Sequence, residues 1–157
     1  MIFVTLGTQD KQFKRLLDLI ENSHIDDEII VQAGFTNYSS KKMKIYSYLE
    51  KPIFEKYIYE ADLIISHAGV GTIVSSLKRG QKVLAVPRLS KYGEHHNDHQ
   101  LQIADAYYQK GYIEVLKEGE DIDEKIKSMK NFKPKKFVTN NEVFVNKLKD
   151  YIMLEEN

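Results

Sequence analysis

The amino-acid sequence predicts an α/β fold in which helices cover a parallel sheet. Short apolar runs of strand type alternate with longer amphipathic segments, which is the pattern of parallel strands joined by helices. The chain has 157 residues, of which 42% are hydrophobic, so a single domain can bury a complete core. It contains no cysteine, which rules out a disulfide scaffold and suits a reducing compartment.

The elements follow in order along the chain. Six apolar runs are predicted as strands, namely residues 2–6, 28–33, 43–49, 63–66, 83–86 and 112–116. From Phe13 to Ile20, apolar residues recur at helical spacing within a predicted helix over residues 11–22. Pro52 suits the first turn of a short helix over residues 52–59. Further helices are expected over residues 70–78, 97–110, 122–129 and 142–154.

A domain boundary is expected near residue 130. Residues 1–130 contain the predicted sheet, and residues 131–157 contain a linker with Pro134 and an amphipathic last helix. That helix would either pack on the chain's own sheet or dock onto a partner. Six lysines lie from Lys125 to Lys136, and a solvated face explains them better than contact with anionic lipid headgroups.

The charge balance argues against one class of partner. The 23 basic and 23 acidic side chains give a formal net charge of zero, so we expect no nucleic-acid partner. The apolar start, residues 1–6, is too short for a secretory signal, and no apolar run approaches the ~20 residues of a membrane span. We therefore expect a cytoplasmic protein whose contact with a membrane is peripheral or made through a partner.

Candidate site residues follow the predicted strands, because ligands of an open parallel sheet bind outside the carboxyl ends of its strands. Gly7, Thr8, Gln9 and Asp10 follow the first strand. Glycine permits a sharp turn and the close approach of a ligand. Capping of the next helix by Thr8 or Asp10 would explain this segment equally well.

The second candidate segment is Ser-His-Ala-Gly-Val-Gly-Thr at residues 66–72, a strand-to-helix turn. Gly69 and Gly71 leave backbone N–H groups unobstructed at the positive end of a helix, where a diphosphate would be stabilised. The segment lacks the third glycine of a dinucleotide fingerprint, and tight strand–helix packing would also explain its glycines. His67, taken alone, is more often a hydrogen-bonded structural histidine than a catalyst.

The third candidate segment, residues 87–100, combines a polar loop with a helix start. Asn97 and Gln100 have the spacing of a capping box. Capping does not explain three histidines, an arginine, two acids and a tyrosine within thirteen positions, a density typical of a binding site. His95 and His99 have the spacing of metal ligands, but the usual companion acid is missing, so we expect no metal. No nucleophile elbow is present.

Together these segments resemble one known family. They are the glycine loop after the first strand, I-S-H-A-G-V-G-T at 65–72, K-R-G-Q-K-V-L-A-V-P at 78–87 and P-R-L-S-K-Y-G-E-H-H-N-D-H-Q at 87–100. Over residues 1–113 the chain is similar to the C-terminal, donor-binding half of GT-B glycosyltransferases of the lipid II synthase type. Within that group it is most similar to single-domain subunits of bacterial capsule and exopolysaccharide synthesis. Those subunits are relatives of the catalytic subunit that adds the second N-acetylglucosamine to dolichol-linked sugar in eukaryotes.

The resemblance implies a Rossmann-like sheet that forms a single GT-B half domain and binds a UDP-sugar. It also implies inverting transfer of a hexose to a lipid-diphosphate-linked acceptor sugar, without a metal or other cofactor. The sequence of residues 87–100 resembles the capsule and exopolysaccharide subunits most, and this resemblance favours galactose and a β-1,4 link. A UDP-N-acetylglucosamine transferase subunit is the alternative. Ser75 stands where relatives of the lipid II synthase type carry a glutamate for the uridine ribose, so only a weaker neutral hydrogen bond is available there.

By family position, residues 69–72 would hold the diphosphate, residues 98–100 would contact the donor sugar, and residues 7–9 would face the acceptor cleft. The predicted donor site comprises Gly7, Thr8, Gln9, His67, Ala68, Gly69, Val70, Gly71, Thr72, Ser75, Arg88, Tyr92, Asn97, Asp98, His99 and Gln100.

Inverting transfer needs a base for the acceptor hydroxyl and donors that stabilise charge on the leaving UDP. Helix amides after Gly69, assisted by Arg88 or His95, are expected to stabilise the UDP. Glu94 and His95 are the candidate bases, unless another subunit supplies the base. Because the resemblance covers only a donor half, we expect a membrane-associated partner subunit that binds the acceptor lipid. The alternative is a non-catalytic subunit that binds nucleotide sugar or stabilises a partner.

Overall fold

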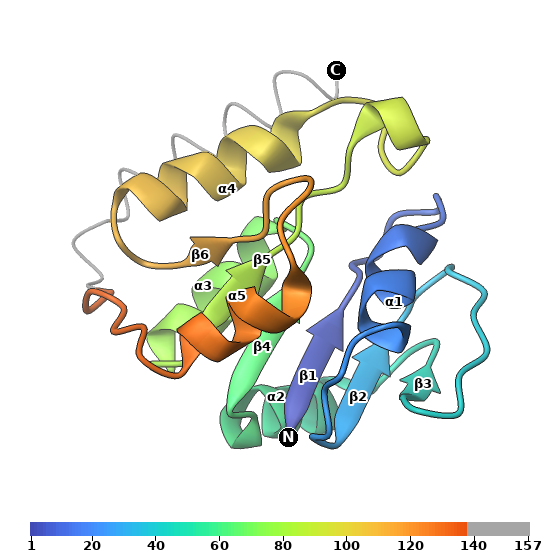
Figure 1. Ribbon diagram of the computed structural model, residues 1–157, viewed down its shortest axis with the longest axis horizontal. Coiled ribbons are helices and arrows are strands. Elements are labelled where there is room, and N and C mark those ends of the chain that lie inside the picture. Colours follow the sequence, from blue (N-terminus) through green and yellow to red (C-terminus); the bar gives the residue numbers. More distant parts are fainter. Residues whose placement is uncertain (138–157) are drawn as a thin grey trace.

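The computed structural model describes residues 1–137, which form a six-stranded parallel sheet between two layers of helices (Figure 1). The strands are β1 (Ile2–Thr5), β2 (Ile29–Gln32), β3 (Lys44–Tyr46), β4 (Leu63–Ser66), β5 (Val83–Ala85) and β6 (Glu114–Val115). The helices are α1 (Lys14–Glu21), α2 (Lys51–Glu60), α3 (Val70–Lys78), α4 (His99–Gln109) and α5 (Ile122–Met129), with a 3₁₀ turn η1 (Ser90–Tyr92). The predicted α/β class is confirmed.

The order of the strands locates the crevice of the sheet. It is β3-β2-β1-β4-β5-β6, so the chain moves outward from β1 to β3, returns to β4 beside β1, and then moves outward the other way. Loops that leave the carboxyl ends of β1 and β4 therefore diverge, and ligands of such sheets bind at this point. Thr5 and Ser66 are paired at this edge, with their hydroxyl oxygens 3.0 Å apart.

The core occupies both faces of the sheet. On β1, the side chain of Phe3 packs among residues of α2, α3 and α4, whereas Val4 packs on the opposite face with α1 and α5. The central strands are therefore buried on both sides, which is why they appear in the sequence as continuous apolar runs. This packing explains why the strands could be predicted without any alternation of polar and apolar residues.

Two predicted helices begin later than expected. α1 begins at Lys14 because the residues before it form a loop, in which the Phe13 N–H donates to Thr36 Oγ1 at 3.1 Å. α4 begins at His99, and its N-cap residue makes no side-chain capping bond. The capping box that the spacing of Asn97 and Gln100 would allow is not formed. Asn97 Oδ1 accepts from the His99 N–H at 3.0 Å, and the Gln100 side chain points into the loops beyond β4 and β5.

Residues 131–137, predicted as the start of a linker, pack against the sheet domain. Phe132 packs against the core cluster that includes residues of α5, and the ring of Phe137 meets that of Tyr112 edge-on, with ring centroids 5.3 Å apart. The predicted last helix, residues 142–154, lies outside the described residues. Among the helices formed by residues 1–137, none has the length and apolar character that a membrane span requires.

Candidate functional site

Three loops meet at the carboxyl edge of the sheet, in the crevice between β1 and β4. The loop after β1 begins near Gly7, and the loop after β4 contains His67 and Gly69. The segment after β5 continues through η1 to the start of α4. Two grooves open among these loops, with volumes of about 390 Å³ and about 180 Å³.

The two grooves meet at the start of α3, because both are lined by Thr8, His67 and Gly69. The larger groove lies over the ends of β1, β2 and β4 and is also lined by Thr5, Gly7, Gln32, Tyr48, Leu49, Lys51, Phe54, Gly71 and Thr72. The smaller groove lies between the same loops and α4 and is also lined by Gln9, Ala68, Val70, His95, Asn97, His99, Gln100 and Ile103.

Two glycines make room for the His67 ring. A Cβ at Gly7 would lie 2.6 Å from His67 Cε1, and a Cβ at Gly69 would overlap the same atom. Gly7 also has φ +79°, a conformation that favours glycine. Gly71 differs, since nothing lies within 4 Å of the place its Cβ would occupy. Packing therefore explains Gly7 and Gly69, whereas Gly71 leaves space that is open to a ligand.

His67 presents a neutral ring to both grooves. Its side chain is buried, and its Nδ1 lies 3.1 Å from Gln100 Nε2. Burial, together with the nearby Arg88 guanidinium, lowers the pKa of His67 to about 3. The imidazole is therefore uncharged near neutral pH and can act there as a hydrogen-bonding group rather than as a cation.

Arg88 is fully buried and lines neither groove. Its guanidinium donates to the carbonyl oxygens of Leu6 at 3.1 Å, Lys11 at 2.8 Å and Glu94 at 2.9 Å. Burial lowers the pKa of Arg88 to about 10, so the group stays charged at neutral pH. This geometry does not support the expectation that Arg88 contacts the donor, because its N–H groups are used to join the loops after β1 and β5.

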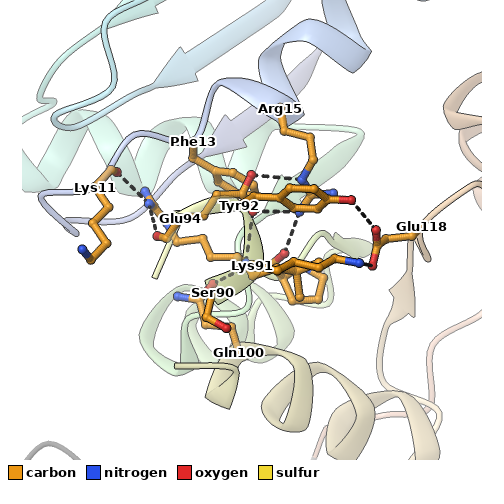
Figure 2. Close-up of polar contacts among 12 residues, drawn as sticks. Lys11, Phe13, Arg15, Ser90, Lys91, Tyr92, Glu94, Gln100 and Glu118 are labelled. Atoms are coloured by element: carbon orange, nitrogen blue, oxygen red, sulfur yellow. Dashed lines mark hydrogen bonds and ion pairs between the residues drawn. The ribbon is translucent and has the colours of Figure 1, made fainter. Parts of the chain in front are cut away.

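Glu94 is also held inside the fold (Figure 2). Its carboxylate accepts from Arg15 Nε at 3.0 Å, from Arg15 Nη2 at 2.9 Å and from the Leu89 N–H at 3.0 Å. The carboxylate side chain is only 4% exposed and lines neither groove. A base must reach the acceptor hydroxyl, so this geometry does not support Glu94 as the base.

Tyr92 and Asp98 also lie outside both grooves. The Tyr92 hydroxyl donates to Glu118, as Figure 2 shows. Asp98 Oδ1 accepts from the Ser90 N–H at 2.9 Å, and this bond lowers the pKa of Asp98. Both side chains therefore organise the segment around η1, and their predicted contact with the donor is not supported by this arrangement.

The structure brings most of the other predicted residues together. Along the two grooves it assembles Gly7, Thr8, Gln9, His67, Ala68, Gly69, Val70, Gly71, Thr72, His95, Asn97, His99 and Gln100. Ser75 lines neither groove, and its Oγ accepts from Arg79 Nη1 at 2.8 Å.

Sequence reasoning missed the wall of the larger groove formed by Gln32, Tyr48, Leu49, Lys51 and Phe54. Their position along the chain could have identified them, because these residues lie at the end of β2 or follow β3, at the same edge of the sheet.

The histidines near the start of α4 interact with their neighbours. The His95 ring stacks on that of His96 with centroids 4.6 Å apart, and His99 Nδ1 lies 3.1 Å from Gln102 Oε1. Within residues 1–137, no group of three or more histidine, aspartate or glutamate side chains is arranged to hold a metal ion. The expected independence from metal stays a prediction.

Comparison with known proteins identifies the family of the chain. Residues 1–154 match the glycosyltransferase family 28 C-terminal domain. The chain is also similar to the UDP-N-acetylglucosamine transferase subunit ALG13 of Cryptococcus neoformans var. neoformans serotype D. The two are 40% identical over 75 residues, which cover 46% of this chain and 35% of that protein. The chain thus aligns with about a third of the relative's length.

Two solved structures have a similar fold. The solution NMR structure of ALG13 has a TM-score of 0.56 and 22% identity, with 94% of both chains covered. The calicheamicin glycosyltransferase CalG4 has a TM-score of 0.62 and 12% identity, with 97% of this chain and 37% of that chain covered. The fold is Rossmann-like and corresponds to one half of a GT-B glycosyltransferase. With residues 1–154 matched, the chain belongs to the family of the glycosyltransferase family 28 C-terminal domain.

Proposed function

We propose that this chain is the donor-binding subunit of a UDP-sugar-dependent glycosyltransferase. The observation that carries the proposal is the meeting of two unequal grooves at the N-terminus of α3. A nucleotide sugar has the matching form, with a nucleoside and a sugar joined through a diphosphate. The family membership favours this ligand over other anions.

The diphosphate would lie at the start of α3. This helix has Gly69 as its N-cap, no side-chain capping bond and no acidic residue in its first turn. The first amides of a helix lack partners within the helix and carry the positive end of its dipole. Gly71 leaves the approach open, and His67 adds a neutral polar group. These features together suit a diphosphate without requiring a basic side chain.

The nucleoside would occupy the larger groove and the sugar the smaller one. Tyr48 and Phe54 give the larger groove aromatic walls on which a base can pack. The smaller groove has the polar side chains of Gln9, Asn97 and His99, which can hydrogen-bond sugar hydroxyls. This assignment uses the difference in volume and in chemistry between the two grooves.

The donor sugar is proposed to be N-acetylglucosamine. The sequence pattern favoured galactose and capsule or exopolysaccharide synthesis, but the similar curated protein is a UDP-N-acetylglucosamine transferase subunit. Its name supports the alternative reading better than the galactose reading. Hexose specificity is therefore the first property to be measured.

The proposed enzyme needs a partner subunit. Neither groove, as residues 1–137 form it, is lined by an aspartate or glutamate that could deprotonate an acceptor hydroxyl. His95, in the smaller groove, is the remaining candidate on this chain, and a membrane-associated partner that binds the lipid-linked acceptor is the other source of the base. The similar curated protein is itself described as a subunit. In this proposal the chain is cytoplasmic and reaches the inner face of the membrane through its partner.

Saturation-transfer NMR tests the donor proposal directly. The purified chain is mixed in turn with UDP-N-acetylglucosamine, UDP-galactose and UDP, with ADP as the control nucleotide. We expect saturation of the uridine protons and weaker or no saturation of the adenosine protons. Absence of uridine nucleotide binding would overturn the glycosyltransferase proposal. If UDP-galactose alone gave signals from its sugar protons, the choice of N-acetylglucosamine would be wrong.

A transfer assay with and without the partner then separates an enzyme from a binding subunit. No aspartate or glutamate from residues 1–137 lines either groove, and this favours activity only in the presence of the partner. Transfer by this chain alone would refute the need for a partner. Donor binding without transfer, even with the partner, would favour the non-catalytic alternative.

A further inference from the structure

We infer that Gln100 is a positioning residue that holds His67 as a neutral ring with its proton on Nε2, directed at the oxygens of the ligand. The inference rests on the proposed function for the identity of the ligand. It adds to the expected role of Gln100, which the family resemblance assigned to contact with the donor sugar.

The orientation of the Gln100 amide is set by the main chain. Gln100 Oε1 accepts from the backbone N–H of Arg88 at 3.1 Å, which requires the oxygen on that side. The amide nitrogen must then face His67, where Nε2 lies 3.1 Å from Nδ1. Because an amide nitrogen only donates, the assignment of oxygen and nitrogen follows from the Arg88 contact.

This contact decides which nitrogen of His67 carries the proton. Nδ1 faces a donor and must act as the acceptor, so in the neutral ring the proton resides on Nε2. The ring cannot turn away easily, because it lies against Gly7 and Gly69, where even a Cβ would overlap it. Position and tautomer of His67 are therefore both determined by its surroundings.

The other edge of the ring is the part that a ligand can reach. His67 Nε2 makes no hydrogen bond within residues 1–137, and it is not among the fully enclosed polar atoms of that range, because the His67 ring lines both grooves. Nε2 therefore retains access to the grooves that the ring lines. It lies beside Gly69, the N-cap of α3, where the diphosphate is proposed to bind.

The charges around His67 favour a neutral ring. Burial is the largest effect against a second proton, and Arg88 from the segment after β5 and His95 from the segment before α4 act in the same direction; together they outweigh the Gln100 hydrogen bond, which raises the pKa of His67. A neutral Nε2–H donates to a phosphate oxygen. The opposite tautomer would present a lone pair to the same oxygen and repel it. Gln100 thus acts on the ligand through His67.

The matched test is Gln100→Glu, with Gln109→Glu on the exposed end of α4 as its control. A carboxylate at residue 100 still accepts from the Arg88 N–H, but it replaces the donor that faces Nδ1 with an acceptor. Nitrogen-15 spectra of the imidazoles report the protonated nitrogen directly, and His67→Gln assigns the resonance. Gln100→Met serves as a second variant that removes the amide without adding charge.

We expect His67 to have its proton on Nε2 in the wild-type chain and in Gln109→Glu. In Gln100→Glu the proton should be on Nδ1 or on both nitrogens, and in Gln100→Met the two tautomers should be mixed. We also expect the affinity for UDP, measured by calorimetry, to fall about tenfold in Gln100→Glu and to be unchanged in Gln109→Glu.

A wild-type ring with its proton on Nδ1, or an unchanged tautomer in both Gln100 variants, would overturn the inference. So would a changed tautomer in Gln100→Glu with an unchanged UDP affinity. A different result would overturn the proposed function, namely that the wild-type chain does not bind UDP. The nitrogen-15 spectra do not depend on any ligand, so the two failures are distinguishable.

Discussion

Gly71→Asp should abolish most UDP binding without unfolding the protein. Gly71 is the second residue of α3, and it lines the larger groove with free space where a Cβ would lie. The fold can therefore accept an aspartate side chain there. An acidic residue in the first turn of a helix is also favourable, and aspartate has a slightly higher helix propensity than glycine. We expect the free energy of unfolding to stay the same or to rise.

The effect on binding comes from charge. Two unit charges 4 Å apart interact by about 1 kcal/mol in water and by about 4 kcal/mol at the effective dielectric of a protein surface. A carboxylate at the open edge of this groove, facing a diphosphate, should therefore cost about 2 kcal/mol, which is about a 30-fold loss of affinity. Calorimetric titration of UDP at low ionic strength measures this loss, and added salt should reduce it.

Gly71→Asn is the control because asparagine has nearly the same size as aspartate and no charge. We expect the asparagine variant to bind UDP within a few-fold of the wild-type affinity. An aspartate variant with wild-type affinity would refute the location of the diphosphate. An equal loss in both variants would show that bulk is responsible, and the electrostatic argument would then be wrong.

The remaining predictions concern stability and the larger groove. The pKa of about 3 for folded His67 lies below the usual value of 6.5, so this group stabilises the fold above pH 6.5 and loses that contribution as the pH falls. Urea unfolding should show a loss of about 2 kcal/mol from this group by pH 5, and His67→Gln should lack it; a pH dependence shared by both would contradict the assignment. Arg88→Met should lower the free energy of unfolding by about 3 kcal/mol or more because three carbonyl oxygens lose their donor, whereas the surface control Arg79→Met should change it by less than about 1 kcal/mol. Tyr48→Ala should weaken UDP binding about fivefold through lost packing on the base, with Tyr59→Ala as an exposed control of the same kind; equal affinities would place the nucleoside elsewhere.

Local patterns were sufficient to predict the sheet. The strands and helices lie where apolar runs and helical spacing indicated, and the helices over residues 70–78 and 122–129 have the predicted bounds. These elements depend on hydrophobic burial, which the sequence displays directly. The rule that ligands bind at the carboxyl edge of a parallel sheet then identified the three loops that meet at the grooves, but not the wall formed by the end of β2 and the residues after β3.

The roles of individual polar residues could not be predicted in the same way. Arg88 and Glu94 were counted as site residues because they belong to a dense run of charged and polar residues that follows a predicted strand. Arg88 instead bonds to Leu6 and Glu94 to Arg15, partners about 80 positions away in the chain. Such contacts depend on how the loops pack, and no local pattern encodes them. A buried ion pair and a catalytic cluster have the same composition until the fold separates them.

The Arg88 guanidinium affects local unfolding around the grooves. It ties together the end of β1, the approach to α1 and the segment after β5, and all three contribute to the surroundings of the grooves. Partial opening of any one of them must break the same set of hydrogen bonds. The amide hydrogens of these three segments should therefore exchange with solvent as one cooperative unit, with protection close to that of the central strands. A ligand that binds there would stabilise the protein against global unfolding rather than against a local fluctuation. Nucleotide would then bind only to molecules in which the first and second halves of the sheet have assembled.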